Sequence, residues 1–210
     1  MSTESFRRLG VALVALGLTA CGGPIVHDLV PLSGKENSVP EITQVTHVVF
    51  ETTEGDIRIA VYPEAAPNAA QRFVELVEAG YYDDTPVFRI VPDFVAQFGI
   101  NWREPLSDWR ERNFNDDPPL FALERGTLAF AKAGPNTNST QVFINYVENN
   151  RLADPQYNFT AFGAVIEGMD VADRFAQVGE MNQGRLWANG DAYIDSLGQK
   201  PTMIERARVE

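Results

Sequence analysis

The chain of 210 residues is long enough for one domain with appendages and for a sizeable hydrophobic core. Its 44% hydrophobic and 22% charged residues are ordinary for a globular protein. The formal net charge of −12 argues against a nucleic-acid partner, because no basic patch is available to neutralise phosphates.

The first 21 residues are arranged like a secretory signal. Arg7 and Arg8 form a short basic region, and residues 9–20 form an apolar run that is too short to span a bilayer. The run ends in Leu-Thr-Ala-Cys, which resembles the lipobox of bacterial lipoproteins, where cleavage leaves a lipidated cysteine. We therefore expect residues 1–20 to be a signal peptide and Cys21 to anchor an exported protein in a bacterial membrane. Stable anchoring would need two or more acyl chains.

Cys21 is the only cysteine, so an internal disulfide is impossible. The alternative is an ordinary signal peptide followed by an incidental free thiol. Gly22, by resemblance to lipoprotein sorting rules, favours the periplasmic face of the outer membrane if the cell is Gram-negative. Residues 21–44, with several prolines, glycines and serines and no periodicity, predict a flexible tether ahead of a domain over 45–210.

Regular patterns begin at Val45. Glu54-Gly55 separates two runs of alternating apolar residues, which predicts a hairpin with one buried face. Pro67–Ala79 has helical apolar spacing, with proline at its start and glycine just after its end, so we expect a helix there.

Later in the chain, the patterns predict a strand over 161–166, a second helix over 169–178, a loop over 179–200 and a last strand over 202–209. Hairpin-like pairs with only two helices favour a mainly β fold, a closed antiparallel barrel, over parallel βαβ units. The connection over 100–125 is long and polar, and its Trp102 and Trp109 either pin it to the barrel or contact a partner.

The stretch Val87–Gly99, VFRIVPDFVAQFG, places Arg89 inside apolar sequence. A turn at Pro92-Asp93 restarts the strand, and Phe94 and Gln97 follow. A guanidinium among apolar neighbours is costly unless something uses it, although Arg89 could also lie on the wet face of a half-buried strand.

A second stretch, GTLAFAKAGPNTNSTQVFIN over 126–145, joins two short apolar strands through a polar loop. Together, the two stretches resemble the signature of the cyclophilin family of peptidyl-prolyl isomerases, and the likeness covers roughly residues 45–209. Two long motifs in order are far more specific than a short pattern. The resemblance implies an eight-stranded antiparallel barrel capped by an α-helix at each end, with no cofactor and no metal, and we expect a monomer.

The resemblance also assigns roles to site residues. It implies that Arg89 acts on the prolyl nitrogen and that Gln97 holds the carbonyl before the proline. The other expected substrate-binding residues are Phe94, Val95, Phe143 and Leu152 for the proline pocket, Ala131, Lys132 and Gln141 for the groove that holds preceding residues, and Phe159. The backbone of Lys132 matters most there, so its side chain should be tolerated.

Some residues depart from the family pattern. Val95 stands where methionine is common, Arg151 where many eukaryotic members have tryptophan, and Phe159 where they have histidine. The missing tryptophan puts tight cyclosporin binding in doubt more than it does catalysis.

The activity implied is rotation of X–Pro bonds in unfolded or loop segments of exported proteins. An arginine can favour the twisted amide through a hydrogen bond that the planar amide cannot accept. Two alternatives are a non-catalytic, membrane-tethered peptide-binding or chaperone module on the same barrel, and a solute-binding lipoprotein. A pure binding module would not need Arg89, and a solute-binding lipoprotein would be expected to have a longer chain with two lobes.

Overall fold

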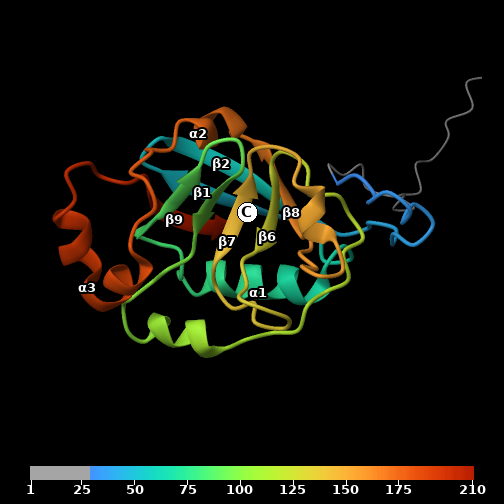
Figure 1. The fold of residues 1–210 in the computed structure, drawn as a ribbon, viewed down its shortest axis with the longest axis horizontal. Helices are drawn as coiled ribbons and strands as arrows, with labels where there is room; N and C mark the ends of the chain where they lie inside the picture. The colour runs from blue at the N-terminus through green and yellow to red at the C-terminus, as the bar shows by residue number, and fades with distance from the viewer. Residues whose placement is uncertain (1–28) are drawn as a thin grey trace, which may run out of the picture.

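A computed structural model gives the fold and describes residues 29–210. Its centre is one antiparallel sheet, in the order β3-β9-β1-β2-β8-β6-β7-β5-β4 (Figure 1). The strands are β1 (Thr46–Thr52), β2 (Gly55–Val61), β3 (Thr85–Pro86), β4 (Arg89–Val91), β5 (Val95–Phe98), β6 (Thr127–Phe130), β7 (Val142–Asn145), β8 (Gly163–Glu167) and β9 (Met203–Val209).

The sheet curls round because its two end strands are consecutive in the chain. Only Val87 and Phe88 separate β3 from β4. The amide of Val87 extends the pairing with β9 by donating to the carbonyl of Thr202 at 2.9 Å, and the amide of Phe88 donates to the carbonyl of Gln97 at 3.0 Å. The predicted mainly β, antiparallel barrel is confirmed, with nine strands where eight were expected, because one strand is interrupted at these two residues.

The β1–β2 hairpin forms at the predicted turn, with Thr52 opposite Gly55. Phe50 pairs with Ile57, and Val48 pairs with Ile59. All four of these side chains are buried, since one face of each strand turns toward the barrel interior.

Helix α1 (Pro67–Glu78) begins at the predicted proline and packs its apolar stripe on the barrel. The Phe73 ring lies 5.9 Å from Phe50 and 5.1 Å from Phe162, measured between ring centroids. Figure 1 places α1 on the opposite side of the barrel from α2 (Met169–Asp173), which is shorter than the predicted second helix over 169–178. Both expected helices are therefore present.

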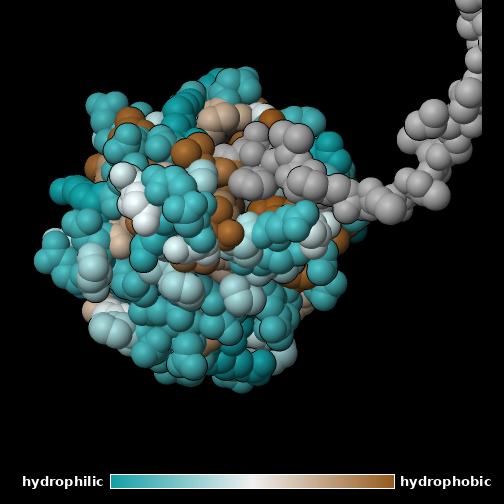
Figure 2. Space-filling view, turned by 90° about the vertical axis from the view of Figure 1, so that its right-hand side faces the viewer, coloured by the Kyte–Doolittle hydropathy of each residue, from teal (hydrophilic) through white to brown (hydrophobic). Residues whose placement is uncertain are grey.

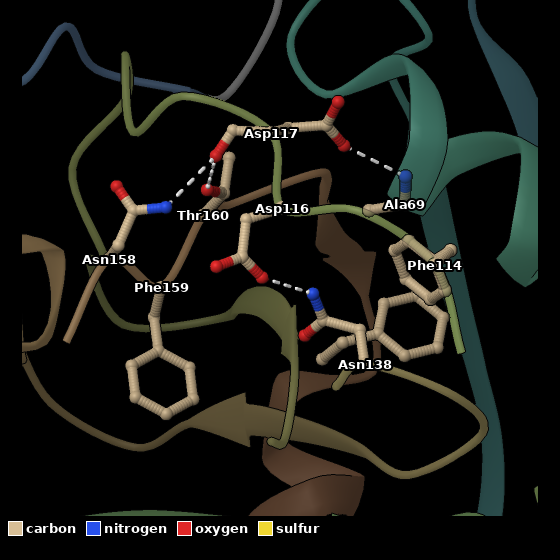
Figure 3. A pocket seen from close by; sticks show the side chains of 9 residues that line it. Ala69, Phe114, Asp116, Asp117, Asn138, Asn158, Phe159 and Thr160 are labelled. Atoms are coloured by element: carbon tan, nitrogen blue, oxygen red, sulfur yellow. Dashed lines mark hydrogen bonds between the residues drawn. The ribbon is translucent and has the colours of Figure 1, made fainter. Parts of the chain in front are cut away.

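The N-terminus of α1 is capped from a distant loop, because its own N-cap residue, Ala66, offers no side-chain acceptor. The Asp117 carboxylate accepts hydrogen bonds from the backbone amide of Asn68 at 3.2 Å and from that of Ala69 at 2.9 Å (Figure 3). Burial is the largest influence on this carboxyl group and raises its pKa above the usual value. The cap holds the loop before β6 against α1.

Replacing Asp117 with alanine should lower the free energy of unfolding by about 1–2 kcal/mol, because two helix amides lose their acceptor. Urea denaturation followed by circular dichroism measures this loss. Asp117→Asn keeps one acceptor oxygen and should recover part of the loss. An alanine variant as stable as the native chain would show that the cap contributes nothing.

Residues 179–200 were expected to form a loop, and this expectation was wrong. The structure has a third helix, α3 (Gln183–Asp195), which projects to one side of the barrel (Figure 1). Gly190 interrupts it with a φ of 47°, and a Cβ atom there would lie 2.1 Å from Nε1 of Trp102. The helix therefore depends on glycine at 190 to let the Trp102 ring pack against its backbone.

The tether prediction for residues 21–44 must be revised for residues 29–44, which lie on the barrel. Leu29 and Ile42 are buried in the same apolar cluster as Val95 and Phe143. The amide of Leu32 donates to the carbonyl of Leu120 at 2.9 Å, which fixes the segment to the loop ahead of β6. Cys21 and the predicted signal peptide lie outside the described residues.

The face drawn in Figure 2 is largely hydrophilic, which agrees with the net charge of −12. Figure 2 shows apolar surface near the centre of the face toward the viewer. Val30 is among the exposed large apolar side chains. Across residues 29–210, no helix is long and apolar enough to cross a membrane.

Candidate functional site

The site begins at the β4–β5 hairpin. Its turn contains Asp93 with a φ of 55°, a conformation that aspartate tolerates better than most residues. The hairpin register sets Arg89 opposite Gln97, and Nη1 of Arg89 donates to Oε1 of Gln97 at 3.3 Å. Pairing in the sheet therefore fixes the two polar groups beside one another.

A pocket of about 260 Å³ opens next to this pair. Nine of the ten predicted catalytic and substrate-binding residues line it: Arg89, Phe94, Val95, Gln97, Ala131, Lys132, Phe143, Leu152 and Phe159. They come from β4, β5, β7 and three connecting segments, so the fold brings together residues that are up to 70 positions apart. The tenth, Gln141, lies next to the pocket.

Aromatic rings form much of the pocket wall. Phe143 and Phe159 meet edge to face, with centroids 5.7 Å apart. The guanidinium of Arg151 lies 5.8 Å from the centre of the Phe94 ring, a cation–π contact at the pocket rim. The result is an apolar recess with one guanidinium, that of Arg89, in its lining.

A second hollow of about 370 Å³ continues from the pocket. The two share Gln97, Ala131 and Lys132. Gln141 lines the second hollow, accepting a hydrogen bond from Nε2 of Gln97 at 2.8 Å. We refer to the first hollow as the pocket and to the second as the groove.

The side chain of Lys132 is buried, which the sequence did not indicate. Only 4% of it is exposed, and its Nζ lies 2.7 Å from Oδ2 of Asp116, itself 11% exposed. Nζ also donates to the carbonyl of Asn158 at 2.9 Å and lies 5.3 Å from the centre of the Phe159 ring. Asn138 completes the arrangement by donating to the other Asp116 oxygen at 2.7 Å (Figure 3).

This buried ion pair links four segments behind the pocket wall. Lys132 follows β6, Asp116 belongs to the loop before it, Asn138 belongs to the polar loop before β7, and Asn158 precedes the Phe159 ring. The side chain of Lys132 therefore pairs with Asp116 and packs against Phe159, in addition to the backbone role expected for this residue.

The two tryptophans of the connection over 100–125 pack inward. Trp109 lies against the main core cluster, with the Arg72 guanidinium 5.4 Å from its ring centre. Trp102 belongs to the smaller cluster under α3. These contacts fit the alternative in which the two tryptophans pin the connection to the barrel, rather than the one in which they contact a partner.

Two polar residues next to the site were not predicted. Glu180 forms an ion pair with Arg89, 3.5 Å between Oε1 and Nε, and Gln183 at the start of α3 lines the groove. The spacing of Leu186, Gly190 and Tyr193, with Asn182 as a possible cap, is the sequence signal that could have revealed this helix. In the described part of the chain, no three acidic, histidine or cysteine side chains are placed to hold a metal ion.

An antiparallel barrel with an arginine beside an apolar recess and an adjoining groove defines a peptide-binding class of site. The family model for cyclophilin-type peptidyl-prolyl cis-trans isomerases matches residues 47–198. The chain belongs to this family, and its activity is peptidyl-prolyl cis–trans isomerisation.

Similar proteins of known name agree. The chain is 31% identical over 173 residues to peptidyl-prolyl cis-trans isomerase A of Dickeya dadantii, covering 80% of this chain and 86% of that protein. It is 38% identical over 138 residues to peptidyl-prolyl cis-trans isomerase-like 1 of Gibberella zeae, covering 63% of this chain and 83% of that one.

Solved structures share the fold. A cyclophilin-type isomerase from Cryptosporidium parvum superposes with a TM-score of 0.57 at 22% identity, covering 80% of this chain and 98% of that one. The cyclophilin AquaCyp293 from Hirschia baltica gives a TM-score of 0.54 at 18% identity, covering 77% and 73%.

Proposed function

We propose that this enzyme accelerates X–Pro rotation by presenting Arg89 to the prolyl nitrogen of the twisted amide while the proline ring occupies the apolar pocket. The observation that carries the proposal is the presence of Arg89 in the lining of a pocket that Phe94 and Phe143 also form. No nucleophile, metal or cofactor is needed, since no covalent bond is made or broken.

The chemistry follows from the electronic structure of the amide. Rotation faces a barrier of roughly 18–20 kcal/mol because the planar C–N bond has partial double-bond character. In the twisted state the nitrogen gains a lone pair, which can accept a hydrogen bond that the planar amide cannot. A donor aimed at that lone pair binds the transition state better than the ground state, and this lowers the barrier.

Arg89 has the contacts that such a donor requires. Its side chain is 25% exposed, and its charge is permanent at ordinary pH. Nη1 is engaged by Gln97 and Nε faces Glu180, which orient the guanidinium. Within residues 29–210, no hydrogen bond engages Nη2, which leaves this nitrogen able to donate to a substrate.

In this proposal, the other site residues each contact a different part of the substrate. Phe94, Val95, Phe143, Leu152 and Phe159 enclose the proline ring. Gln97 holds the carbonyl that precedes the proline, and the residues before it extend along the groove past Ala131, Lys132 and Gln141.

The test is acceleration of cis–trans exchange in an Ala-Pro peptide by the purified full-length chain. Ala-Pro is a suitable probe because a related C. parvum structure was solved in the presence of that dipeptide. Exchange rates by NMR should rise in proportion to enzyme concentration. Peptide binding without any acceleration would instead support the non-catalytic, membrane-tethered peptide-binding or chaperone module.

We also propose that the protein is exported and attached to a bacterial membrane through lipid on Cys21, where it acts on proline-containing segments of exported proteins. The support is the Leu-Thr-Ala-Cys sequence after a short apolar run.

Replacing Cys21 with alanine should therefore move the protein from the membrane fraction to the soluble fraction of bacterial cells. Mass spectrometry of the native protein should find acyl chains on the cysteine. An unmodified native cysteine, or a native protein that fractionates like the variant, would contradict the anchor.

A further inference from the structure

The segment just before α3 places an exposed negative charge beside Arg89. Glu180 lies 3.5 Å from Arg89, yet 62% of its side chain is exposed. Its carboxylate therefore faces solvent beside the pocket and is only partly engaged by the arginine.

The position of Glu180 is fixed by its neighbours. The amide of Met181 donates to the carbonyl of Phe88 at 2.9 Å, so the residue after Glu180 is bonded to the residue before Arg89. The Met181 side chain is 3% exposed and packs in the apolar cluster under α3. This backbone anchor holds Glu180 next to Arg89 whatever rotamer the glutamate adopts.

The same segment extends the groove. Nε2 of Gln141 donates to Oε1 of Gln183 at 3.3 Å, which continues the line of side-chain hydrogen bonds that starts at Arg89 and passes through Gln97. Gln183 also lines a shallow hollow formed by residues 180–184, with a volume of about 480 Å³. Through Gln183, this hollow joins the groove proposed for residues that precede the proline.

Helix α3, which begins within this hollow, is held by side chains of the connection over 100–125. The Arg103 guanidinium lies 2.8 Å from the Asp191 carboxylate, and the Arg110 guanidinium lies 4.9 Å from the centre of the Trp187 ring. The amide of Asn182 donates to the hydroxyl of Tyr193 at 3.0 Å. The hollow over residues 180–184 is thus part of the folded structure, and its shape is set before a peptide binds.

From these contacts we infer that Glu180 is a specificity-determining residue that selects X–Pro substrates carrying a lysine or arginine shortly before the proline. The inference rests on the proposed function of the pocket and groove. A cationic side chain entering the hollow over residues 180–184 meets the exposed carboxylate, whereas an acidic one is repelled. Because Glu180 also contacts Arg89, a bound cation would share the carboxylate with the guanidinium.

The test compares Ala-X-Ala-Pro-Phe peptides in which X is lysine, glutamine or glutamate, with cis–trans exchange measured by NMR. The native enzyme should show a kcat/KM about two- to fivefold higher for the lysine peptide than for the glutamate peptide at low salt, a ratio typical of one exposed ion pair. About 0.5 M salt should reduce this ratio, because the Debye length shortens to about 4 Å and the attraction between exposed charges is screened.

In Glu180→Gln the lysine-to-glutamate ratio should fall close to one. Glu205→Gln is the matched control, because Glu205 is exposed on β9 and does not line the pocket or groove. The substitution changes the net charge by the same amount as Glu180→Gln. Its ratio should equal that of the native enzyme.

An unchanged lysine-to-glutamate ratio in Glu180→Gln, whether or not kcat falls equally for all the peptides, would overturn the inference. Failure of the proposed function is separable from this outcome, because then the native enzyme would accelerate none of the peptides.

Discussion

Replacing Arg89 with alanine is expected to reduce kcat/KM for an Ala-Pro peptide by about 100- to 1000-fold, the loss typical of removing one preorganised transition-state donor. The guanidinium lines the pocket, and Gln97 and Glu180 hold it in place. Peptide affinity should change much less, because the nitrogen of the planar ground-state amide cannot accept a hydrogen bond from the arginine. Protease-coupled isomerisation measures the rate.

Two further variants sharpen this prediction. Arg89→Lys keeps the positive charge but loses the planar fork of donors, so its activity should stay well below that of the native enzyme. Arg174→Ala removes the arginine that follows α2, whose side chain is 53% exposed, and its activity should be native-like. An alanine variant at 89 that retains most of the native rate would refute the role assigned to the guanidinium.

Replacing Lys132 with methionine is expected to lower the free energy of unfolding by about 3–5 kcal/mol, because it leaves the Asp116 carboxylate buried without its cation. Methionine fills a similar volume, so loss of packing contributes little. Urea denaturation measures the effect.

The double variant Lys132→Met, Asp116→Asn should recover most of that stability, since both charges are then absent. In the double variant Asn138 can still donate to the oxygen of residue 116. A single variant as stable as the native chain would show that water reaches Asp116 and replaces the lysine.

Much of the barrel could be predicted from local sequence. Alternating apolar residues around Glu54-Gly55 identify the first hairpin, and the turn at Pro92-Asp93 identifies the hairpin that carries the site. The site residues could be predicted because two long motifs occur in the family order. Sheet pairing then converts the eight-residue spacing between Arg89 and Gln97 into direct contact.

What could not be predicted depends on contacts between distant segments. Helix α3 contains a glycine at 190 that suggests a loop, and only the Trp102 ring packed against it explains why glycine is there. Residues 29–44 lack periodicity because just a few side chains, such as Leu29 and Ile42, reach the barrel. The Lys132–Asp116 pair joins positions 16 residues apart, a separation with no regular pattern to indicate it.

The central claim is that the Arg89 side chain lowers the rotational barrier while the peptide is bound. NMR exchange spectroscopy of an Ala-Pro peptide saturated with enzyme measures the on-enzyme cis–trans rate separately from the binding affinity. Arg89→Ala should bind the peptide with an affinity close to that of the native enzyme and show an on-enzyme rate lower by about two to three orders of magnitude. A variant that binds the peptide and interconverts its two isomers at the native rate would contradict the claim.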